Sequence, residues 1–222
     1  MIGGEPVAGF GLAAALLLAL ATSTGSASGA PEASERQRVR SVSGPELSLA
    51  LGWGDPHGQR DSGADLARVV VGQVPVEASA GFRTAFGLSL FAQGRYGWLI
   101  GRDCASSCSG SVVRVGFGLE YHFTPDDHVD HYVGLGAGYE WLARDVGISQ
   151  ESYRGPEWVS FTFGEEFALG PIGIGPVLSA ALGQFTHKES NVPPVPPIAE
   201  PIDKRAVHVW LLLGVRASYG WR

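Results

Sequence analysis

The sequence SVVRVGFGLEYHF, at positions 111–123, alternates between apolar and polar residues along almost its whole length. In an extended chain one face would carry Val113, Val115, Phe117, Leu119, Tyr121 and Phe123, and the other Arg114, Gly116, Gly118, Glu120 and His122. Because the side chains of a β-strand point alternately to its two faces, this stretch predicts a strand with one wholly apolar face.

Further stretches show the same two-residue period. It is clear at 131–141 and 207–221, and weaker at 46–53, 75–83, 88–100, 158–167 and 172–185. Clusters of Gly, Pro, Asp and Ser separate these stretches, which is typical of strands joined by turns. We therefore expect eight strands. Glu165 falls on the apolar face of the stretch 158–167, so we expect a β-bulge or an early strand end there.

The connections between these strands alternate in length. Long connections are expected at 54–74, 101–110, 144–157 and 186–206, and short ones at 84–87, 124–129 and 168–171. Bacterial up-and-down barrels combine short periplasmic turns with long external loops. The predicted fold class is all-β, an eight-stranded antiparallel up-and-down transmembrane β-barrel with both ends of the barrel domain in the periplasm.

The residues before the first strand divide into two segments. The apolar run from Ala8 to Ala21 is about 14 residues long, shorter than the ~20 that a membrane-spanning helix needs. Small residues follow this run, which is typical of a secretory signal peptide. We predict a signal peptide at 1–27, a polar periplasmic linker at 28–44 and the barrel at 45–222; an uncleaved membrane anchor is the alternative.

Two features indicate that the apolar faces contact lipid. The predicted polar faces contain Gly, Ser, Arg and Glu but no Lys, which is unusual for a strand face in water. Aromatic residues lie near the predicted strand ends, as expected of the girdles at the two membrane interfaces. These interface aromatics are Trp53, Trp98, Trp141, Tyr121, Phe123, Tyr219 and Trp221. A soluble barrel with the aromatics packed in its core is the alternative.

Four short stretches and the alternating final strand resemble those of a known protein family. The stretches are 74–76 (VPV), 81–83 (GFR), 121–123 (YHF) and 133–141 (VGLGAGYEW). The chain is similar to the small OmpA/OmpX-like and OmpW-like bacterial outer-membrane barrels from about residue 45 to the end. The resemblance implies a fold and an outer-membrane location in a Gram-negative bacterium, and carries over no catalytic residues. Such barrels usually end on an aromatic residue that the barrel-assembly machinery reads, whereas here Arg222 follows Trp221.

Charged residues on the polar faces are expected to point into the barrel. They are Glu77, Arg83, Arg95, Arg114, Glu120, Glu140, Glu166 and Arg216, four of each sign. An eight-stranded barrel is just wide enough for side chains to fill. We expect Arg95, Arg114 and Glu140 to meet in one upper cluster, and the remaining charges except Glu77 to form a lower cluster beside Glu46. Balanced signs favour a closed, ion-paired plug; a selective or gated pathway is the alternative.

The predicted function is a non-enzymatic barrel with exposed external loops and a role in surface interaction or envelope integrity. A narrow porin or carrier is the second hypothesis, an outer-membrane lipid-modifying enzyme the third and a soluble periplasmic ligand-binding barrel the fourth. The chain has no His-x-Ser pair, and His187, Glu189 and Ser190 are the nearest approach to a catalytic group. The turn 126–131 carries metal-compatible side chains, but its sequence is also that of a tight turn, and we expect neither a metal nor a cofactor.

Partners follow from composition and location. With net charge −6 and pI near 5.5 the chain lacks the basic surface that nucleic acid requires. We expect a monomer that contacts outer-membrane lipid and the barrel-assembly machinery. The external loops, including the proline-rich stretch 191–201, could meet an external ligand or protein.

Cys104 and Cys108 are the only cysteines and fall in a predicted external loop. Exported proteins meet an oxidising compartment, where disulfides persist. We expect these two cysteines to form a disulfide; a metal or redox pair is the alternative, although no second pair of ligands accompanies it.

Overall fold

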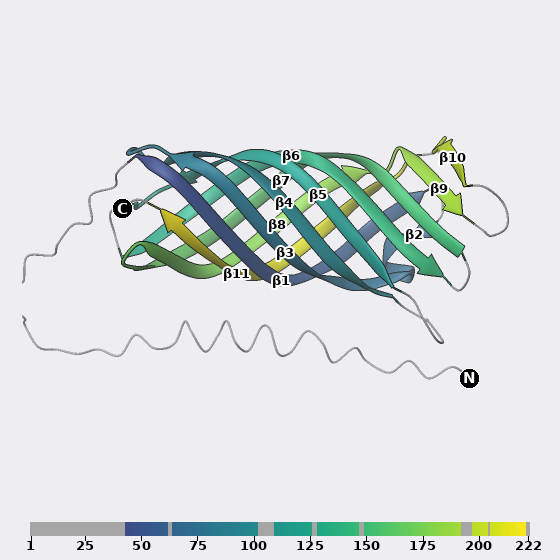
Figure 1. Cartoon of the computed structure of the whole chain (residues 1–222), viewed down its shortest axis with the longest axis horizontal. Helices are drawn as coiled ribbons and strands as arrows, with labels where there is room; N and C mark the ends of the chain where they lie inside the picture. Colours follow the sequence, from purple (N-terminus) through teal and green to yellow (C-terminus); the bar gives the residue numbers. More distant parts are fainter. Residues whose placement is uncertain are drawn as a thin grey trace, which may run out of the picture. The chain divides into compact units, whose positions relative to one another are not determined.

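The computed structural model describes residues 43–61, 64–101, 109–125, 128–146, 149–191, 197–203 and 205–220. Eight long strands form a closed antiparallel barrel (Figure 1). They are β1 (Gly44–Asp61), β3 (Val70–Arg83), β4 (Leu88–Gly101), β5 (Gly110–His122), β6 (Val129–Val146), β7 (Ser149–Leu169), β8 (Ile172–Gln184) and β11 (Val207–Gly220). Strands β2 (Ala64–Asp65), β9 (His187–Asn191) and β10 (Ile198–Pro201) and the 3₁₀ helix η1 (Leu66–Arg68) are short additions. The predicted all-β, eight-stranded antiparallel up-and-down barrel is confirmed.

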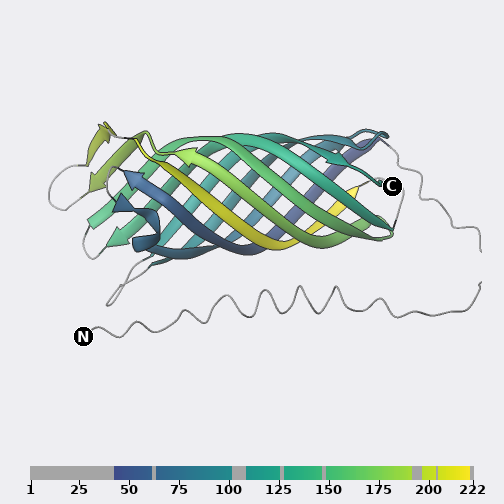
Figure 2. The ribbon, with the colours of Figure 1, turned by 180° about the vertical axis from the view of Figure 1, so that it is seen from behind.

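Each long strand pairs with its neighbour in sequence, and β11 closes the barrel by pairing with β1 from Glu46↔Gly220 to Gly58↔His208. Figure 2 shows β11, in yellow, between β1 and β8. The connections 84–87 and 170–171 lie at one end of the barrel, which we call the turn end. Strand β1 begins and β11 ends there, whereas β9 and β10 lie at the opposite end, the loop end (Figure 1).

The strands extend further towards the loop end than the sequence pattern predicts. Most of the expected connection 144–157 is strand, because β6 continues to Val146 and β7 begins at Ser149. Strand β1 continues to Asp61, and the hairpin of β9 and β10 adds to β7 through pairs such as Tyr153↔Lys188. The prediction of a long connection at 144–157 is therefore wrong. The connection expected at 54–74 is shortened to the residues between Asp61 and Val70, and the one at 186–206 contains the β9–β10 hairpin. Pro and Gly residues interrupt the two-residue alternation in these extensions. Pairing with the neighbouring strands nevertheless holds the chain in an extended β conformation.

The outward faces change character along the barrel. Over the central part they carry exposed apolar side chains, including Leu47, Leu90, Phe117, Leu135, Phe161 and Leu178. Beyond this belt, the outward positions of β1 are Asp55, His57 and Gln59, and those of β7 are Gln150, Ser152 and Arg154. The belt has the chemistry of a lipid-facing surface, and the strand extensions that of a surface in water.

A β-bulge in β7 changes which residues of that strand face inward. The register shifts between Glu157 and Val159 relative to both β6 and β8. As a result Trp158 and Val159 are both exposed, whereas Glu157 and Ser160 on either side are both buried. The bulge expected at Glu165 is not there: the strand runs on to Leu169, and partly exposed Glu165 forms an ion pair with His131, 3.2 Å away.

Several expectations lie outside the described residues. They are the signal peptide at 1–27, most of the linker at 28–44, the disulfide between Cys104 and Cys108, and the terminal aromatic Trp221. In the part of the chain that the structure describes, no helix is long and apolar enough to cross a membrane.

The seam that closes the barrel requires glycine at its centre. Gly52 of β1 faces Gly214 of β11, and a Cβ atom at Gly52 would lie only 2.2 Å from the carbonyl oxygen of Leu213. At Gly94, by contrast, an added Cβ would have no heavy atom nearer than 4.0 Å.

We predict that Gly52→Ala lowers the free energy of unfolding by about 1–3 kcal/mol, because the two backbones must separate to admit the methyl group. Gly94→Ala is the matched control and should change the value by less than about 0.5 kcal/mol. Urea titration of both variants in lipid vesicles measures the difference. Equal effects of the two substitutions would contradict this description of the seam.

Candidate functional site

The interior of the barrel is the candidate functional site, because it gathers charged side chains that a closed wall removes from water. All eight charged residues assigned to the interior from the sequence lie on inward faces. Six are buried, namely Arg95, Arg114, Glu120, Glu140, Glu166 and Arg216, and Glu77 and Arg83 are partly buried. Glu46, His122, Asp130, Glu157 and His208 are buried with them.

Two arginines organise the turn end. Arg83 donates to both carboxylate oxygens of Glu46, through Nη2 at 2.6 Å and Nε at 2.9 Å. Nη1 of Arg216 donates to both oxygens of Glu120, at 2.7 and 2.8 Å. Arg216 also lies 4.8 Å above the centre of the Tyr132 ring. Such charge-assisted bonds, with both carboxylate oxygens engaged, are among the stronger polar contacts in proteins. The lower cluster expected beside Glu46 is present.

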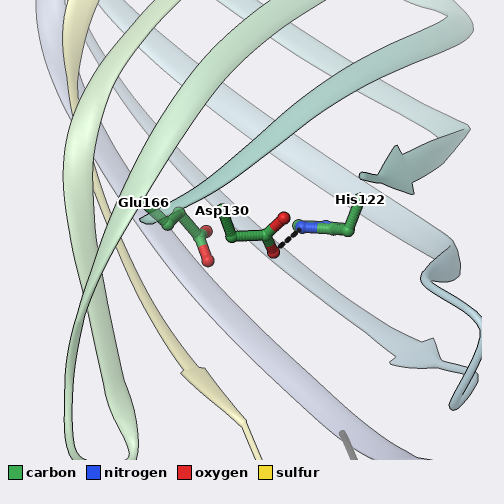
Figure 3. A group of neighbouring side chains, drawn as sticks. All are labelled: His122, Asp130 and Glu166. Atoms are coloured by element: carbon green, nitrogen blue, oxygen red, sulfur yellow. Dashed lines mark hydrogen bonds and ion pairs between the residues drawn. The ribbon is translucent and has the colours of Figure 1, made fainter. Parts of the chain in front are cut away.

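A second group at the turn end joins three consecutive strands. His122 ends β5, Asp130 lies at the start of β6, and Glu166 lies near the end of β7. Figure 3 shows Asp130 between the other two side chains, with its Oδ2 atom 2.7 Å from Nδ1 of His122. All three side chains are at most 1% exposed. One nitrogen or oxygen atom from each lies within 4.8 Å of the other two, so the group has the composition and spacing of metal ligands.

The charges in the middle of the barrel pair differently from the expected upper cluster. Arg95, Arg114 and Glu140 are cross-strand neighbours, but Arg95 donates to Glu77 at 2.8 Å and Arg114 forms an ion pair with Glu157. The three therefore lie side by side on neighbouring strands, as the expected upper cluster requires, but both arginines pair with carboxylates other than Glu140.

The bulge in β7 explains the unexpected partner of Arg114. In a regular strand Glu157 would share the outward face with Phe161, but the bulge turns Glu157 and Ser160 inward together. Arg114 pairs with Glu157 and donates to Ser160 Oγ at 2.9 Å. A bulge of this kind leaves no clear signal in a single sequence, so alternation could not find Glu157.

Glu140 takes partners from the last strand. It accepts a hydrogen bond from the indole nitrogen of Trp210 at 3.1 Å, and its other oxygen lies 3.5 Å from Nε2 of His208. The ring of His208 stacks on Phe185, with the ring centres 4.2 Å apart. Glu140 therefore lies where the charged interior meets an apolar layer.

That apolar layer fills the loop end of the barrel, and we call it the seal. It comprises Leu66, Val70, Leu99, Val112, Leu142, Tyr153, Ala181, Phe185, Ile202, Trp210 and Leu212. Leu66 and Phe185 are fully buried, and Tyr153 and Trp210 are at most 2% exposed. A water-filled passage would expose the side chains that line it, so the interior is closed at this level. The inward positions 208, 210 and 212 of the last strand, His, Trp and Leu, already carry a sequence signal for this layer.

Above the seal, charged side chains gather around Glu151 at the loop end. Arg144 donates to Glu151 at 2.8 and 2.9 Å, and Arg60 and Lys188 form ion pairs with it. Partial burial raises the pKa of the Glu151 carboxyl, but the hydrogen bond and charge of Arg144 and the charges of Arg60 and Lys188 lower it more. The pKa therefore lies below its ordinary value. This cluster lies over Tyr153, and the cationic groups of Arg60 and Lys188 are both placed over its ring.

A small cavity lies between the two charged levels. Its volume is about 40 Å³, and Gln93, Thr162 and Ser179 line it together with the pairs Glu77–Arg95 and Glu120–Arg216. A cavity needs roughly 10–15 Å³ to hold its first water molecule, so this one has room for a few waters. Pockets for small organic ligands are about 300–1,000 Å³, so this cavity is far too small for one.

The expected interface aromatics that the structure describes all point outward. Trp53, Trp98, Trp141, Tyr121 and Tyr219 are between 39% and 53% exposed, and Phe123 is 54% exposed. Three close aromatic pairs form along this surface, Tyr96–Trp98, Tyr121–Phe123 and Tyr139–Trp141. Trp158 joins the outward set because of the bulge.

The residues that came nearest to a catalytic group do not converge. His187 and Glu189 occupy alternate positions of β9 and are exposed, whereas Ser190 lies on the other face of that strand. Nδ1 of His187 contacts the hydroxyl of Thr186 at 2.9 Å.

Solved structures share this architecture. A major outer membrane protein from Thermus thermophilus matches with a TM-score of 0.51 at 11% identity, over 81% of this chain and 99% of that protein. The chain has the fold of the small bacterial outer-membrane barrels. OprG from Pseudomonas aeruginosa (TM-score 0.49, 11% identity, 81% of this chain and 98% of that one) and Neisserial surface protein A (0.44, 15%, 78% and 95%) also match. Neither a protein-family model nor a curated protein sequence matches the chain.

We predict that Glu120→Ala lowers the free energy of unfolding by about 3–5 kcal/mol, because the buried guanidinium of Arg216 loses its two short hydrogen bonds and keeps only the longer contacts to Glu46 and Glu166. Adding Arg216→Met should recover part of the loss. Glu165→Ala, which breaks an exposed pair, is the control and should cost less than about 1 kcal/mol. Urea titration in vesicles compares these three variants with the wild type. The buried-pair assignment fails if Glu120→Ala costs no more than Glu165→Ala.

Proposed function

We propose that this chain is a monomeric, non-enzymatic barrel of the Gram-negative outer membrane, closed to solutes, which acts through the β-structure it presents outside the cell. Its role would be surface interaction or envelope integrity. The observation that carries the proposal is the apolar seal, because it blocks the interior while the strands continue beyond the apolar belt. A barrel that is closed inside and extended outside offers its external surface as the working part.

The belt of exposed apolar side chains supports insertion in a membrane. In a monomeric eight-stranded closure this outward surface has no protein partner, so contact with lipid is what removes it from water. The turn end would face the periplasm and the loop end the exterior, since short turns are periplasmic in barrels of this type. Assembly would then require the barrel-assembly machinery of the outer membrane.

The part beyond the apolar belt is built largely of paired strands. The β9–β10 hairpin continues the sheet of β6 and β7, and η1 places Leu66 in the seal below. The cluster around Glu151 then offers charged groups at the mouth of the barrel. Together these elements form an ordered surface on which an external ligand or protein could bind.

We predict that the purified wild-type protein passes no steady current across a planar lipid bilayer, because the seal leaves no continuous water path. A porin inserted in the same bilayer serves as the positive control. Heat-modifiable mobility on a gel shows that the sample is folded. A steady, ion-selective current from the wild type would contradict the closed barrel and favour the narrow porin or carrier instead.

A second prediction concerns the external surface. Replacing residues 187–201 by a short Gly-Ser turn should leave a heat-modifiable barrel in the outer membrane, because these residues lie outside the eight-stranded closure. In a strain that lacks the wild-type gene, this variant should fail to restore the lost phenotype, such as attachment or resistance to detergent, that the wild type restores. Full complementation by the trimmed barrel would show that the hairpin has no part in the function.

A further inference from the structure

The middle of the barrel holds one buried carboxylate that no arginine binds closely. Among the described residues, Arg95 pairs with Glu77 and Arg114 pairs with Glu157. Glu140, 2% exposed, is the third carboxylate at this level. Arg114 lies opposite Glu140 in the sheet and attracts it, but no ion pair joins these two described residues. Buried charges require a partner of opposite sign, so Glu140 needs one further positive charge.

His208 is the residue that reaches Glu140. It belongs to β11, and its imidazole lies over the backbone of Gly183 in β8, where an added Cβ atom would be 3.0 Å from Nε2. Because position 183 has no side chain, the ring extends over β8, and its Nε2 atom lies 3.5 Å from Oε2 of Glu140. Oε1 of Glu140 accepts the hydrogen bond from the indole of Trp210. Glu140 thus contacts one side chain that can carry a positive charge.

The surroundings of His208 favour a charged ring. The imidazole is stacked on the ring of Phe185, with the ring centres 4.2 Å apart and the planes at 16°. A cation over an aromatic face is attracted by the ring electrons. Nδ1 of His208 is buried and has no hydrogen-bond partner in the described part of the chain, so no such bond holds the ring in one neutral form. With His208 protonated, the charges of this level balance: Arg95, Arg114 and His208 against Glu77, Glu140 and Glu157.

The other charged and titratable groups around His208 lie further away. Its neighbours in the sheet are Gly58 of β1 and Gly183 of β8, and Gly58 lies in the part of β1 beyond the apolar belt. Within the described residues, Glu140 is the one carboxylate within 4.0 Å of an imidazole nitrogen of His208. Further groups are Tyr153 and the cluster around Glu151 towards the loop end, and Glu77, Arg95, Arg114 and Glu157 of the middle level, one each from β3, β4, β5 and β7.

We propose that His208 is protonated while the seal is closed, and that its ion pair with Glu140 is a pH-sensitive latch beneath the seal. The pair is joined to two residues of the seal, to Trp210 by a hydrogen bond and to Phe185 by the ring stack. When the proton leaves as the pH rises, Glu140 remains as a buried charge without a cation, and water must enter to solvate it. The seal therefore closes tightly in acid and loosens in base. The latch goes beyond the proposed function, which needs a closed seal but no response to pH.

Nitrogen-15 magnetic resonance of the full chain in lipid nanodiscs reads the charge of the ring directly, with His208→Gln to assign its signals. In the wild type at about pH 7 both ring nitrogens of His208 should carry a proton, and one proton should leave at higher pH. Glu140→Gln should make the ring neutral at about pH 7, because it removes the charge that holds the cation. Glu165→Gln is the matched control, because it removes the outward carboxylate that pairs with His131 and should leave His208 charged.

The latch also predicts how stability and closure depend on pH. The folded chain would keep this proton above the pH of about 6.5 at which an unfolded histidine loses it, so stability is present below that pH and is lost as the pH rises through the folded titration. Relative to His208→Gln, the unfolding equilibrium constant of the wild type should rise by up to about tenfold per pH unit across that titration. In a planar bilayer the wild type should show brief openings above the titration and none below it, and Glu140→Gln should stay closed throughout.

Two results would overturn the proposal. One is a neutral ring of His208 in the wild type at about pH 7, which would place the balancing proton on a carboxylate. The other is a wild type whose stability and bilayer current do not change across the titration of His208, which would leave the ion pair without a part in closing the seal. If Glu140→Gln does not fold, the wild type and His208→Gln decide by the same two readings.

Discussion

A closed wall of eight strands forces every second side chain into a space that water barely enters, and charged side chains there must find partners. The contact of Arg216 with Glu120 is the clearest case, because one guanidinium nitrogen is shared between both oxygens of a buried carboxylate. Removing either partner alone leaves a charge that the interior cannot solvate. The other inward residues are arranged around this constraint.

The interior resolves the constraint in layers. The turn end holds most of the charge, the middle holds the pairs Glu77–Arg95 and Glu157–Arg114 with a small cavity, and the apolar seal separates them from the charged cluster around Glu151 at the loop end. Polar groups thus end where the seal begins, at the bond between Glu140 and Trp210. A barrel built in this way is filled, which supports the proposal that the strands and the hairpin beyond the belt carry its function.

Much of the fold could be predicted from the sequence because the period of two is strong where one face is apolar. The stretch 111–123 became β5 with almost the same limits, and the eight charged residues all face inward. Two kinds of residue escaped prediction. Glu157 lies at a bulge that reverses the alternation, and the extensions of β1 and β7 contain Pro56, Gly58 and Pro156, which read as loop.

The partners of the buried charges could not be predicted either. Cross-strand register places Arg114 beside both Arg95 and Glu140, but Arg114 binds Glu157, which the bulge in β7 turns inward. The group of His122, Asp130 and Glu166 could be foreseen only in part, because the sequence places Asp130 in a turn with metal-compatible side chains, whereas His122 and Glu166 join it from neighbouring strands. The pattern of the chain locates such residues on a face, whereas their pairing depends on packing in three dimensions.

The central claim is that the interior is closed to bulk water and its charges are paired, and proton exchange of the arginine side chains in lipid nanodiscs tests it most directly. Nuclear magnetic resonance of the guanidinium groups can compare Arg114 and Arg216, in the interior, with Arg154, which is exposed at the loop end. If the interior is closed, its guanidinium protons should exchange with water at least a hundred times more slowly than those of Arg154. Equal exchange rates at the three sites would mean that water passes through the barrel, and would contradict a closed interior.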